Sequence, residues 1–211
     1  MALEAILHEA LPGLTSGQYA AFATYCELLL DWNSRMNLTA ITEPGEVAQK
    51  HFADSLLPAA LLPEGAKVID VGTGAGFPGL PLKILRPDIR LTLLDSLQKR
   101  IGFLQALCEA LGLLDVAFFH ARAEDGARQP NLRAGFDIAL SRAVAPCPVL
   151  LELTVPFLRL GGQSLMYKGP QAAEELAGAR NALSLVIIAT KRGETPKAYP
   201  RKAGTPAKAP L

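Results

Sequence analysis

The stretch "DVGTGAGFPG" at residues 70–79 decides the fold of this 211-residue chain. It continues a short, mostly apolar run, "AKVI" at residues 66–69, and leads into "GLPLKILR" at residues 79–86. The first run is typical of a buried strand and the second of a helix. Glycines between a strand and a helix let the backbone approach a ligand closely and adopt positive φ. The stretch therefore predicts a ligand site at the carboxyl edge of an α/β sheet.

The chain after residue 66 keeps this alternation. Strands are predicted at residues 66–72, 89–95, 115–121, 136–144, 161–169 and 184–191, and helices at residues 79–86, 96–112, 148–160 and 172–183. Because each strand is apolar on both faces, we expect a mostly parallel sheet with helices on both sides. Before residue 66, an apolar stripe predicts a helix with Ser16 as its N-cap, followed by a short helix broken by Pro58 and Pro63.

The chain divides into three segments by composition and pattern. We expect an N-terminal helical segment at residues 1–64, a sheet domain at 65–190 and a basic, extended or mobile arm at 191–211. The arm has six basic residues against Glu194 alone, a charge of +5, whereas the rest of the chain sums to −4. A basic tail on an acidic body is typical of contact with a polyanion, although a solvated tail without a function is an alternative.

Cysteine usage and hydropathy restrict the class of protein further. Cys26, Cys108 and Cys147 lie far apart and form no C-x-x-C pair, so we expect a reduced, cytoplasmic protein without disulfides, structural zinc or another metal. The N-terminus lacks the basic region of a signal peptide, and no apolar run approaches the roughly 20 residues of a membrane span. We expect a soluble monomer without a membrane partner.

The glycine spacing distinguishes two classes of nucleotide-binding enzyme. A dinucleotide fingerprint needs G-x-G-x-x-G, but Gly72, Gly74 and Gly76 form G-x-G-x-G, and Phe77 stands where the third dinucleotide glycine belongs. With Asp70 in front, the stretch has the D-x-G-x-G-x-G pattern of methyltransferases that use S-adenosylmethionine. The residues therefore favour methyl transfer, with a nucleotide-dependent oxidoreductase as an alternative.

Acidic residues also follow the next two strands. Asp95 ends the second strand, 19 residues beyond Gly76, where a carboxylate can accept hydrogen bonds from ribose hydroxyls. Glu124 and Asp125 follow the third strand, at an edge that holds adenine. In a purely structural interpretation, Asp70 could form the turn and Asp95 could cap the next helix. Three acids and three glycines at successive strand ends together favour a nucleoside site.

Seven stretches resemble a single family, in the same order along nearly the whole chain. They are "NLTAIT" (37–42), "KHFADSLLP" (50–58), "VIDVGTGAGFPGLPLKI" (68–84), "LLDSLQKR" (93–100), "SRAVAP" (141–146), "KGP" (168–170) and "YPRKAGTPAKAPL" (199–211). They are similar to motifs of the bacterial small-subunit ribosomal RNA guanine-N7 methyltransferases, also called glucose-inhibited division protein B. The resemblance implies a Rossmann-like, class I enzyme that uses S-adenosylmethionine to methylate N7 of a guanosine in the 530 loop of 16S rRNA, as naked rRNA or within an assembling small-subunit particle.

The resemblance also implies roles for particular residues. The expected cofactor-binding residues are Asp70, Gly72, Gly74, Gly76, Phe77, Asp95, Ala123, Glu124 and Arg142. The expected substrate-binding residues are His51, Asp54, Arg142, Lys168, Arg201 and Lys202. Of these, Arg142, Asp54 and His51 are the candidates for orienting the base and stabilising charge.

The chain departs from the family near its C-terminus. Family members usually have another strand and a turn between the helix at about 172–183 and the last strand, and here the helix passes almost directly into that strand. We therefore expect the antiparallel hairpin at the far edge of the sheet to lack a member. Either this is a shortened variant or residues are absent from the sequence.

The implied chemistry needs no general base, because guanine N7 carries an in-plane lone pair and no proton. Displacement at the methyl group requires N7, the methyl carbon and sulfur in line. An acceptor such as Asp54 could stabilise the positive charge that develops on the purine, and Arg142 could bind the guanine O6 edge or a phosphate. Alternatively, Arg142 could form a structural ion pair with Glu124 or Asp137.

Several of these residues and motifs have a second interpretation. His51 could be a core residue, and Lys50 and Asp54 could form an i,i+4 surface pair.

Methylation of another RNA base is an alternative function. Pro146-Cys147 has the form of a cytosine-C5 nucleophile, although ten residues separate Cys147 from Asp137. The chain lacks the D-P-P-Y-type motif of exocyclic-amine methylation. A non-catalytic RNA-binding module is the remaining hypothesis.

Overall fold

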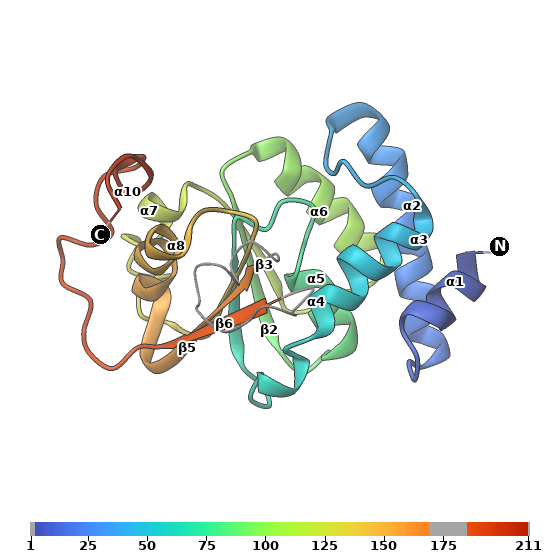
Figure 1. Cartoon of the computed structure of the whole chain (residues 1–211), viewed down its shortest axis with the longest axis horizontal. Helices are drawn as coiled ribbons and strands as arrows, with labels where there is room; N and C mark the ends of the chain where they lie inside the picture. Colours follow the sequence, from blue (N-terminus) through green and yellow to red (C-terminus); the bar gives the residue numbers. More distant parts are fainter. Residues whose placement is uncertain (1–2, 169–184, 211) are drawn as a thin grey trace.

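A six-stranded sheet in the order β3-β2-β1-β4-β5-β6 forms the centre of the molecule (Figure 1). The computed structural model describes residues 3–168 and 185–210. The strands are β1 (Lys67–Val71), β2 (Arg90–Asp95), β3 (Val116–His120), β4 (Phe136–Arg142), β5 (Leu158–Lys168) and β6 (Leu185–Thr190). Strands β1 to β5 pair in parallel and β6 pairs antiparallel with β5. The predicted α/β class with a mostly parallel sheet is confirmed.

Helices cover both faces of this sheet, as Figure 1 shows. One side carries α1 (Leu3–Ala10), α2 (Ser16–Met36), α3 (Pro44–Glu46), the π-helix η1 (Val47–Ala53), α4 (Asp54–Leu56), the 3₁₀ turn η2 (Ala59–Leu61), α5 (Gly79–Leu85) and α6 (Gln98–Ala110). The other side carries α7 (Ala123–Gly126), α8 (Cys147–Thr154), the 3₁₀ turn η3 (Val155–Phe157) and α10 (Thr205–Lys208). In the part of the chain that the structure describes, no helix is both long enough and apolar enough to cross a membrane.

The central strand β1 is buried on both faces, as its apolar sequence predicts. Val68 belongs to the core cluster shared with α2, α5 and α6, whereas Ile69 and Val71 belong to the cluster on the opposite face. All three side chains are at most 1% exposed. From β1 the chain continues to β2 and β3 on one side and then crosses to β4 on the other. This reversal leaves a crevice at the carboxyl ends of β1 and β4, where ligands of such sheets bind.

Two local predictions are wrong. The N-cap of α2 is Thr15, not Ser16, because Thr15 has extended backbone and exchanges hydrogen bonds with Gln18 in a capping box. The helix predicted at 148–160 ends at Thr154, and the chain is already in β5 from Leu158. Pro156 lacks an N–H group and Leu158 pairs with β4, so the strand begins before the glycines that were expected to start it.

The far edge of the sheet agrees with the prediction in part. Strand β6 was expected at residues 184–191 and is observed at Leu185–Thr190, antiparallel to β5. The helix predicted at 172–183 lies outside the described residues. The expected loss of one strand before β6 therefore stays a prediction.

The C-terminal segment, expected as an extended or mobile arm at 191–211, contacts the sheet domain at several points between residues 195 and 204. Arg133 donates hydrogen bonds to the carbonyls of Thr195 and Tyr199 at 3.0 and 2.9 Å, and Arg128 donates to that of Pro200 at 2.6 Å. Arg201 pairs with the carboxylate of Glu152 in α8. The basic residues therefore fold the segment back onto the sheet domain.

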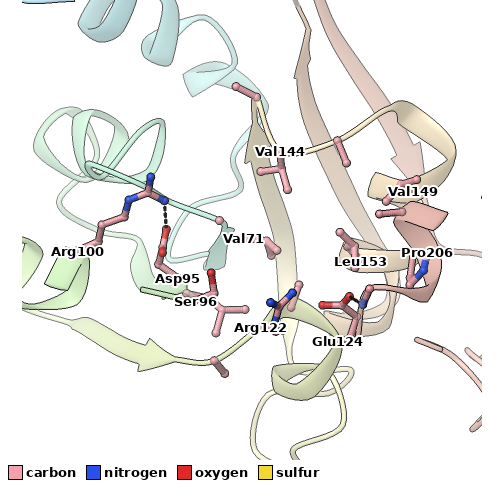
Figure 2. A pocket seen from close by; sticks show the side chains of 18 residues that line it. Val71, Asp95, Ser96, Arg100, Arg122, Glu124, Val144, Val149, Leu153 and Pro206 are labelled. Carbon is pink, nitrogen blue, oxygen red and sulfur yellow. Dashed lines mark hydrogen bonds and ion pairs between the residues drawn. The ribbon is translucent and has the colours of Figure 1, made fainter. Parts of the chain in front are cut away.

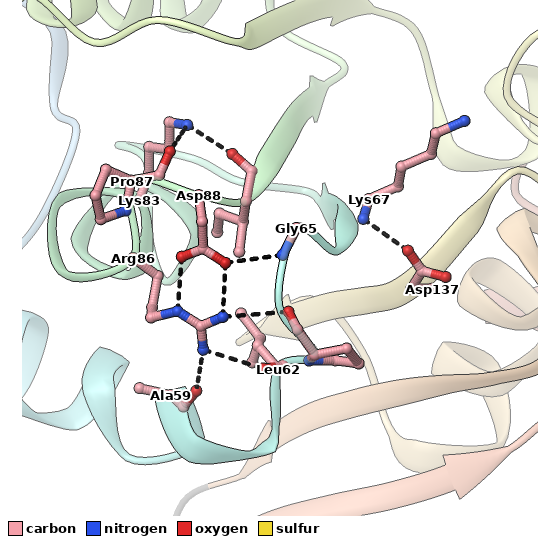
Figure 3. Close-up of polar contacts among 11 residues, drawn as sticks. Ala59, Leu62, Gly65, Lys67, Lys83, Arg86, Pro87, Asp88 and Asp137 are labelled. Atoms are coloured by element: carbon pink, nitrogen blue, oxygen red, sulfur yellow. Dashed lines mark hydrogen bonds and ion pairs between the residues drawn. The ribbon is translucent and has the colours of Figure 1, made fainter.

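Arg86 joins the N-terminal segment to the sheet at the amino ends of the strands (Figure 3). Its guanidinium forms two hydrogen bonds of 2.7 Å with the carboxylate of Asp88 and also donates to the carbonyls of Ala59 and Leu62. Asp88 accepts a further bond from the Gly65 N–H at 2.9 Å. The Arg86 hydrogen bonds hold the pKa of Asp88 well below its usual range. The ionised Asp88 carboxylate therefore stabilises the fold above pH 3.8, and this stabilisation is lost as the pH falls below 3.8.

We predict that Arg86→Met lowers the free energy of unfolding at pH 7 by about 2 kcal/mol, because several charge-assisted hydrogen bonds are lost. Urea denaturation measures this difference. It should shrink below pH 3.8, where Asp88 becomes protonated in the unfolded chain. Arg90→Met, on the exposed first residue of β2, is the control. Equal unfolding free energies for Arg86→Met and the parent protein would contradict this role.

Candidate active site

The first cavity, of about 370 Å³, opens at the carboxyl ends of the central strands (Figure 2). It is lined by residues from the ends of β1 and β2, the loop after β3, the loop after β4, α8 and the C-terminal segment. The lining residues are Val71, Gly72, Leu94, Asp95, Ser96, Arg100, Ala121, Arg122, Ala123, Glu124, Ala143, Val144, Ala145, Val149, Leu153, Gly204, Pro206 and Ala207. The cavity therefore lies at the edge that the glycine stretch predicted.

The glycine loop has backbone that other residues adopt at a cost. Gly72, Gly74 and Gly76 have φ angles of +72°, +61° and +100°. A Cβ atom on Gly72 would lie 2.8 Å from a methyl group of Val144, and one on Gly76 would lie 2.6 Å from the Tyr25 hydroxyl. Gly72 thus lets the loop after β4 come close, and Gly76 lets α2 pack beneath the loop.

Asp70 supports the loop from below. Its side chain is fully buried, and Oδ2 accepts hydrogen bonds from the Thr73 hydroxyl at 2.8 Å and the Gly79 N–H at 2.9 Å. Burial raises the pKa of this carboxyl to about 6, against the opposing effect of these two hydrogen bonds. Asp70 is not among the residues that line the cavity. It therefore forms the turn, as the structural interpretation of the sequence held, and its expected role in cofactor binding stays a prediction.

Asp95 lines the cavity and also organises its rim. Its Oδ2 accepts from the Gly74 N–H at 2.9 Å and lies 3.3 Å from Arg100, and its Oδ1 accepts from the Leu97 N–H at 2.9 Å. Asp95 therefore lines the cavity and also accepts a hydrogen bond at the start of α6, as the two interpretations of the sequence expected. Glu124 lines the opposite wall, where its Oε1 accepts from the Gly204 N–H at 2.8 Å.

A second cavity, of about 300 Å³, adjoins the first. Its lining residues are Lys50, His51, Asp54, Arg142, Ala143, Ala145, Tyr167 and Lys168. Ala143 and Ala145 line both cavities, so the loop after β4 separates them. The structure thus brings together four of the six residues expected to bind substrate.

Arg142 is the most connected residue of the second cavity. Its Nη1 lies 3.2 Å from Asp54 Oδ2 and 3.3 Å from the Lys50 carbonyl, and its Nη2 lies 3.2 Å from His51 Nδ1. The carbonyls that Arg142 contacts belong to η1, a π-helix, a form that occurs mostly at functional sites. The proposed ion pair of Arg142 with Glu124 or Asp137 is wrong, because Arg142 pairs with Asp54.

Lys50 and Lys168 differ in their contacts. Lys50 pairs with Glu46 on the same helical surface, not with Asp54. Lys168, at the end of β5, donates to the carbonyl of Ala145 at 2.8 Å. It thereby holds the loop that separates the two cavities.

His51 is neutral and has a defined tautomer. Burial and the neighbouring Arg142 charge lower its pKa from 6.5 to about 4. Its Nδ1 faces the Arg142 guanidinium, which can only donate, so the ring proton lies on Nε2, 2.8 Å from the Thr39 hydroxyl oxygen. The imidazole stacks on the Phe77 ring with centroids 4.5 Å apart. His51 therefore lines the second cavity with both ring nitrogens paired, and its role in substrate binding stays a prediction.

Phe77 connects the glycine loop to the second cavity. Its ring stacks on Tyr25 with centroids 5.3 Å apart, and the Arg142 guanidinium carbon lies 4.9 Å from its centroid. Tyr25 in turn donates to the carbonyl of Ala75 at 2.7 Å. Tyr25 was not among the predicted site residues, because nothing in its local sequence indicates that its hydroxyl reaches the loop.

Other residues differ from the sequence expectations. Arg201 is held by Glu152, and Arg201 and exposed Lys202 line neither cavity. Cys147, which lies 4.0 Å from the sulfur of Met166, also lines neither, which disfavours a cysteine nucleophile. Tyr167 was missed, although it lies in the second cavity and donates to the Ser55 carbonyl at 2.7 Å. In the described ranges, no three His, Cys, Asp or Glu side chains are placed to hold a metal ion.

Solved structures share this architecture. A predicted O-methyltransferase from Agrobacterium tumefaciens superposes with a TM-score of 0.55 at 17% identity, covering 66% of this chain and 81% of that one. An S-adenosylmethionine-dependent methyltransferase from Aquifex aeolicus gives a TM-score of 0.52 at 17% identity, covering 64% and 72%. The chain therefore has the α/β fold of class I, S-adenosylmethionine-dependent methyltransferases.

Sequence comparison identifies the family within this class. Residues 18–196 match the family of rRNA small subunit methyltransferase G, or GidB. The ribosomal RNA small subunit methyltransferase G of Streptococcus pyogenes is 47% identical over 221 residues, covering 94% of this chain and 93% of that protein. The protein of the same name from Desulfitobacterium hafniense is 46% identical over 219 residues, covering 94% and 91%. This chain belongs to the rRNA small subunit methyltransferase G family, and the predicted resemblance is confirmed.

We predict that His51 makes the fold less stable as the pH falls from 6.5 towards 4. In this interval the unfolded chain binds a proton at His51 that the folded protein excludes, so protonation favours unfolding. His51→Gln removes this titration, and its unfolding free energy should fall less steeply over the same interval in urea denaturation. Asp70 acts in the opposite sense, because its raised pKa lends stability at low pH that is lost as the pH rises through about 6. Asp70 is present in both proteins, so identical slopes would contradict the lowered pKa of His51.

Proposed function

We propose that this enzyme transfers the methyl group of S-adenosylmethionine to N7 of a guanosine in the 530 loop of 16S rRNA. The observation that carries the proposal is the pair of adjoining cavities, which share Ala143 and Ala145 as their common wall. One cavity has the acidic residues and glycine loop of a nucleoside site, and the other has a positive and a negative side chain around an aromatic ring. The substrate is the rRNA alone or an assembling small-subunit particle, which implies a cytoplasmic enzyme.

The first cavity fits the cofactor. Asp95 at its rim supplies carboxylate oxygens for the ribose hydroxyls. The Ala123–Glu124 backbone and the apolar side chains of Val149 and Leu153 fit an adenine ring. Gly72 lies where β1 enters the loop, so the backbone can approach the methionine portion closely. The cofactor supplies an activated methyl group on a sulfonium ion.

The second cavity fits the guanosine. The guanidinium of Arg142 and the ammonium of Lys168 offer donors to the O6 edge of guanine or to a phosphate. Phe77 lines neither cavity, but its ring packs against His51, Tyr25 and Arg142 and so supports two side chains of the second cavity, His51 and Arg142. A base held in this cavity would lie next to the first cavity at Ala143 and Ala145, which line both.

The proposed reaction uses no general base. His51 is unsuited to be a base, because Nδ1 faces the Arg142 donor and the lowered pKa makes the ring a weak proton acceptor. The N7 lone pair needs no deprotonation, so positioning in line with the methyl group carries the rate. Asp54 lies where its carboxylate can stabilise the positive charge that develops on the purine.

Methylation mapping tests this proposal directly. The purified enzyme, S-adenosylmethionine and small-subunit rRNA or particles from a strain lacking the gene are combined, and N7-methylguanosine is mapped by chain cleavage at methylated guanosines. The expected result is one modified guanosine in the 530 loop. A methyl group on another base, or at a guanosine elsewhere, would overturn the assignment of the target.

We predict that Asp54→Asn lowers kcat by about 100-fold, because the acceptor for the developing charge loses its own charge. The affinity for the cofactor should stay unchanged, since Asp54 lines only the second of the two described cavities. Single-turnover methylation and calorimetry separate the two effects. Glu46→Gln, which breaks the neighbouring surface pair with Lys50, is the matched control. Parent-like turnover of Asp54→Asn would remove Asp54 from the chemistry.

We also predict that Gly74→Val abolishes measurable cofactor binding while the protein stays folded. A Cβ at Gly74 meets no described atom within 4 Å, but the φ of +61° is strained for a β-branched residue, and the Gly74 N–H holds Asp95 in place. Gly161→Val is the matched control, because Gly161 has a φ of +79° in equally open space far from the cavity. Calorimetric titration with S-adenosylmethionine gives the comparison. Retained affinity in Gly74→Val would refute this account of the loop, and tighter binding of NAD by the parent protein would favour an oxidoreductase.

A further inference from the structure

A buried ion pair anchors the C-terminal segment, residues 199–210, to α8. The Glu152 side chain is 1% exposed, and its Oε1 accepts from both the backbone N–H and Nε of Arg201 at 2.9 Å. Its Oε2 accepts from Arg201 Nη2 at 2.7 Å. The hydrogen bonds from Arg201 lower the pKa of Glu152, so the carboxylate stays charged. A buried carboxylate is strongly unfavourable without its partner, so the pair holds the segment in one place.

The segment is also fixed beyond this pair. Arg201 Nη2 donates to the carbonyl of Ala209 at 2.6 Å, which closes the segment around α10. Arg128 donates to the Pro200 carbonyl and Arg133 to the Tyr199 carbonyl, from the opposite side. The Arg201 guanidinium therefore links the C-terminal end of α10, at Ala209, to Glu152 of α8.

The inner side of the anchored segment is a wall of the first cavity (Figure 2). Gly204, Pro206 and Ala207 line it, with Gly204 beside Glu124. The Gly204 N–H donates to Glu124 at 2.8 Å, so the segment also sets the position of that carboxylate. Pro206 is buried, whereas Lys202 and Lys208 of the same segment are exposed. The cavity wall is thus apolar, and the charges of the segment lie elsewhere.

We propose that the C-terminal segment completes the adenine side of the S-adenosylmethionine site, with Arg201 as a positioning residue that acts through Glu152. This inference rests on the proposed function, in which the first cavity holds the cofactor. Pro206 and Ala207 line the cavity together with the Ala123–Glu124 backbone and the apolar side chains of Val149 and Leu153, a lining suited to a flat, apolar ring. Arg201 was expected to contact RNA, and its guanidinium is instead committed to Glu152 and the Ala209 carbonyl.

Two pairs of variants test the wall and its anchor separately. Ala207→Phe places a large side chain on an exposed cavity-lining position, and Ala209→Phe places the same side chain on an exposed position of the segment outside the cavity lining. Arg201→Ala removes the anchor, and Arg159→Ala removes the exposed Arg159–Asp137 pair at the other end of the sheet as a control. Arg201→Lys keeps one charged donor towards Glu152.

The measurements are calorimetric Kd values for S-adenosylmethionine, melting temperatures without cofactor, and KM and kcat in rRNA methylation. Arg201→Ala should raise the Kd and the KM for cofactor about tenfold, because the wall is no longer preorganised, while kcat at saturating cofactor stays close to that of the parent. Arg201→Lys should restore part of the affinity. Ala207→Phe should raise the Kd at an unchanged melting temperature, and Ala209→Phe and Arg159→Ala should bind as the parent does.

Each part of the proposal has an outcome that overturns it. Parent-like affinity of Ala207→Phe would show that the segment is no wall of the cofactor site, and parent-like affinity of Arg201→Ala would remove the positioning role. A parent protein that binds no S-adenosylmethionine would instead refute the proposed function itself. If the parent protein binds S-adenosylmethionine and methylates rRNA, and all variants bind the cofactor as tightly as the parent does, the proposed function stands and only the role of the C-terminal segment is rejected.

Discussion

The contact between Arg142 and Asp54 is the interaction on which the site depends. Arg142 ends the central strand β4, and Asp54 begins α4, which belongs to the N-terminal helical segment. The guanidinium also reaches the Lys50 carbonyl and His51 Nδ1 and lies over the Phe77 ring. Because these groups come from the sheet, the helices and the glycine loop, one planar cation sets the relative positions of all three. Only a guanidinium offers enough donors in fixed directions for this purpose.

The N-terminal helices are consequently part of the catalytic structure. Tyr25 from α2 lies against the glycine loop, and Thr39 orients the imidazole of His51. The Lys50 and His51 carbonyls of the π-helix η1 lie 3.3 and 3.5 Å from Arg142 Nη1. The helices therefore shape the second cavity, while the strand ends shape the first. The strand order explains why the two cavities are adjacent. The crevice at the carboxyl ends of β1 and β4 lies next to the N-terminal helices.

The sequence predicted the fold and much of the site for identifiable reasons. Strands such as β1 are buried on both faces, so their apolar runs are conspicuous, and the positive φ angles of Gly72, Gly74 and Gly76 require the residue type that the spacing exposes. Two boundaries were predicted wrongly. Helix α2 is capped by Thr15 and not Ser16, because Thr15 completes a capping box with Gln18. Strand β5 begins at Leu158, because pairing with β4 prevails over the helical pattern of that sequence. Ion-pair partners were harder to predict. Lys50 has acidic residues at both i−4 and i+4. It pairs with Glu46, because Asp54 pairs with Arg142 of strand β4.

By itself, the sequence determined the α/β class, the glycine loop, the family and the residues that gather around Arg142, because all of these are encoded in local spacing and residue type. Only the tertiary structure decided what each of the long-range groups contacts. Asp70 lies beneath the loop and not in the cavity, Tyr25 lies against the loop from a distant helix, and the basic C-terminal segment packs beside Glu124 instead of extending away. The physical reason is that a charged or polar side chain takes whichever partner the folded chain brings within hydrogen-bonding distance, and sequence separation says little about that distance.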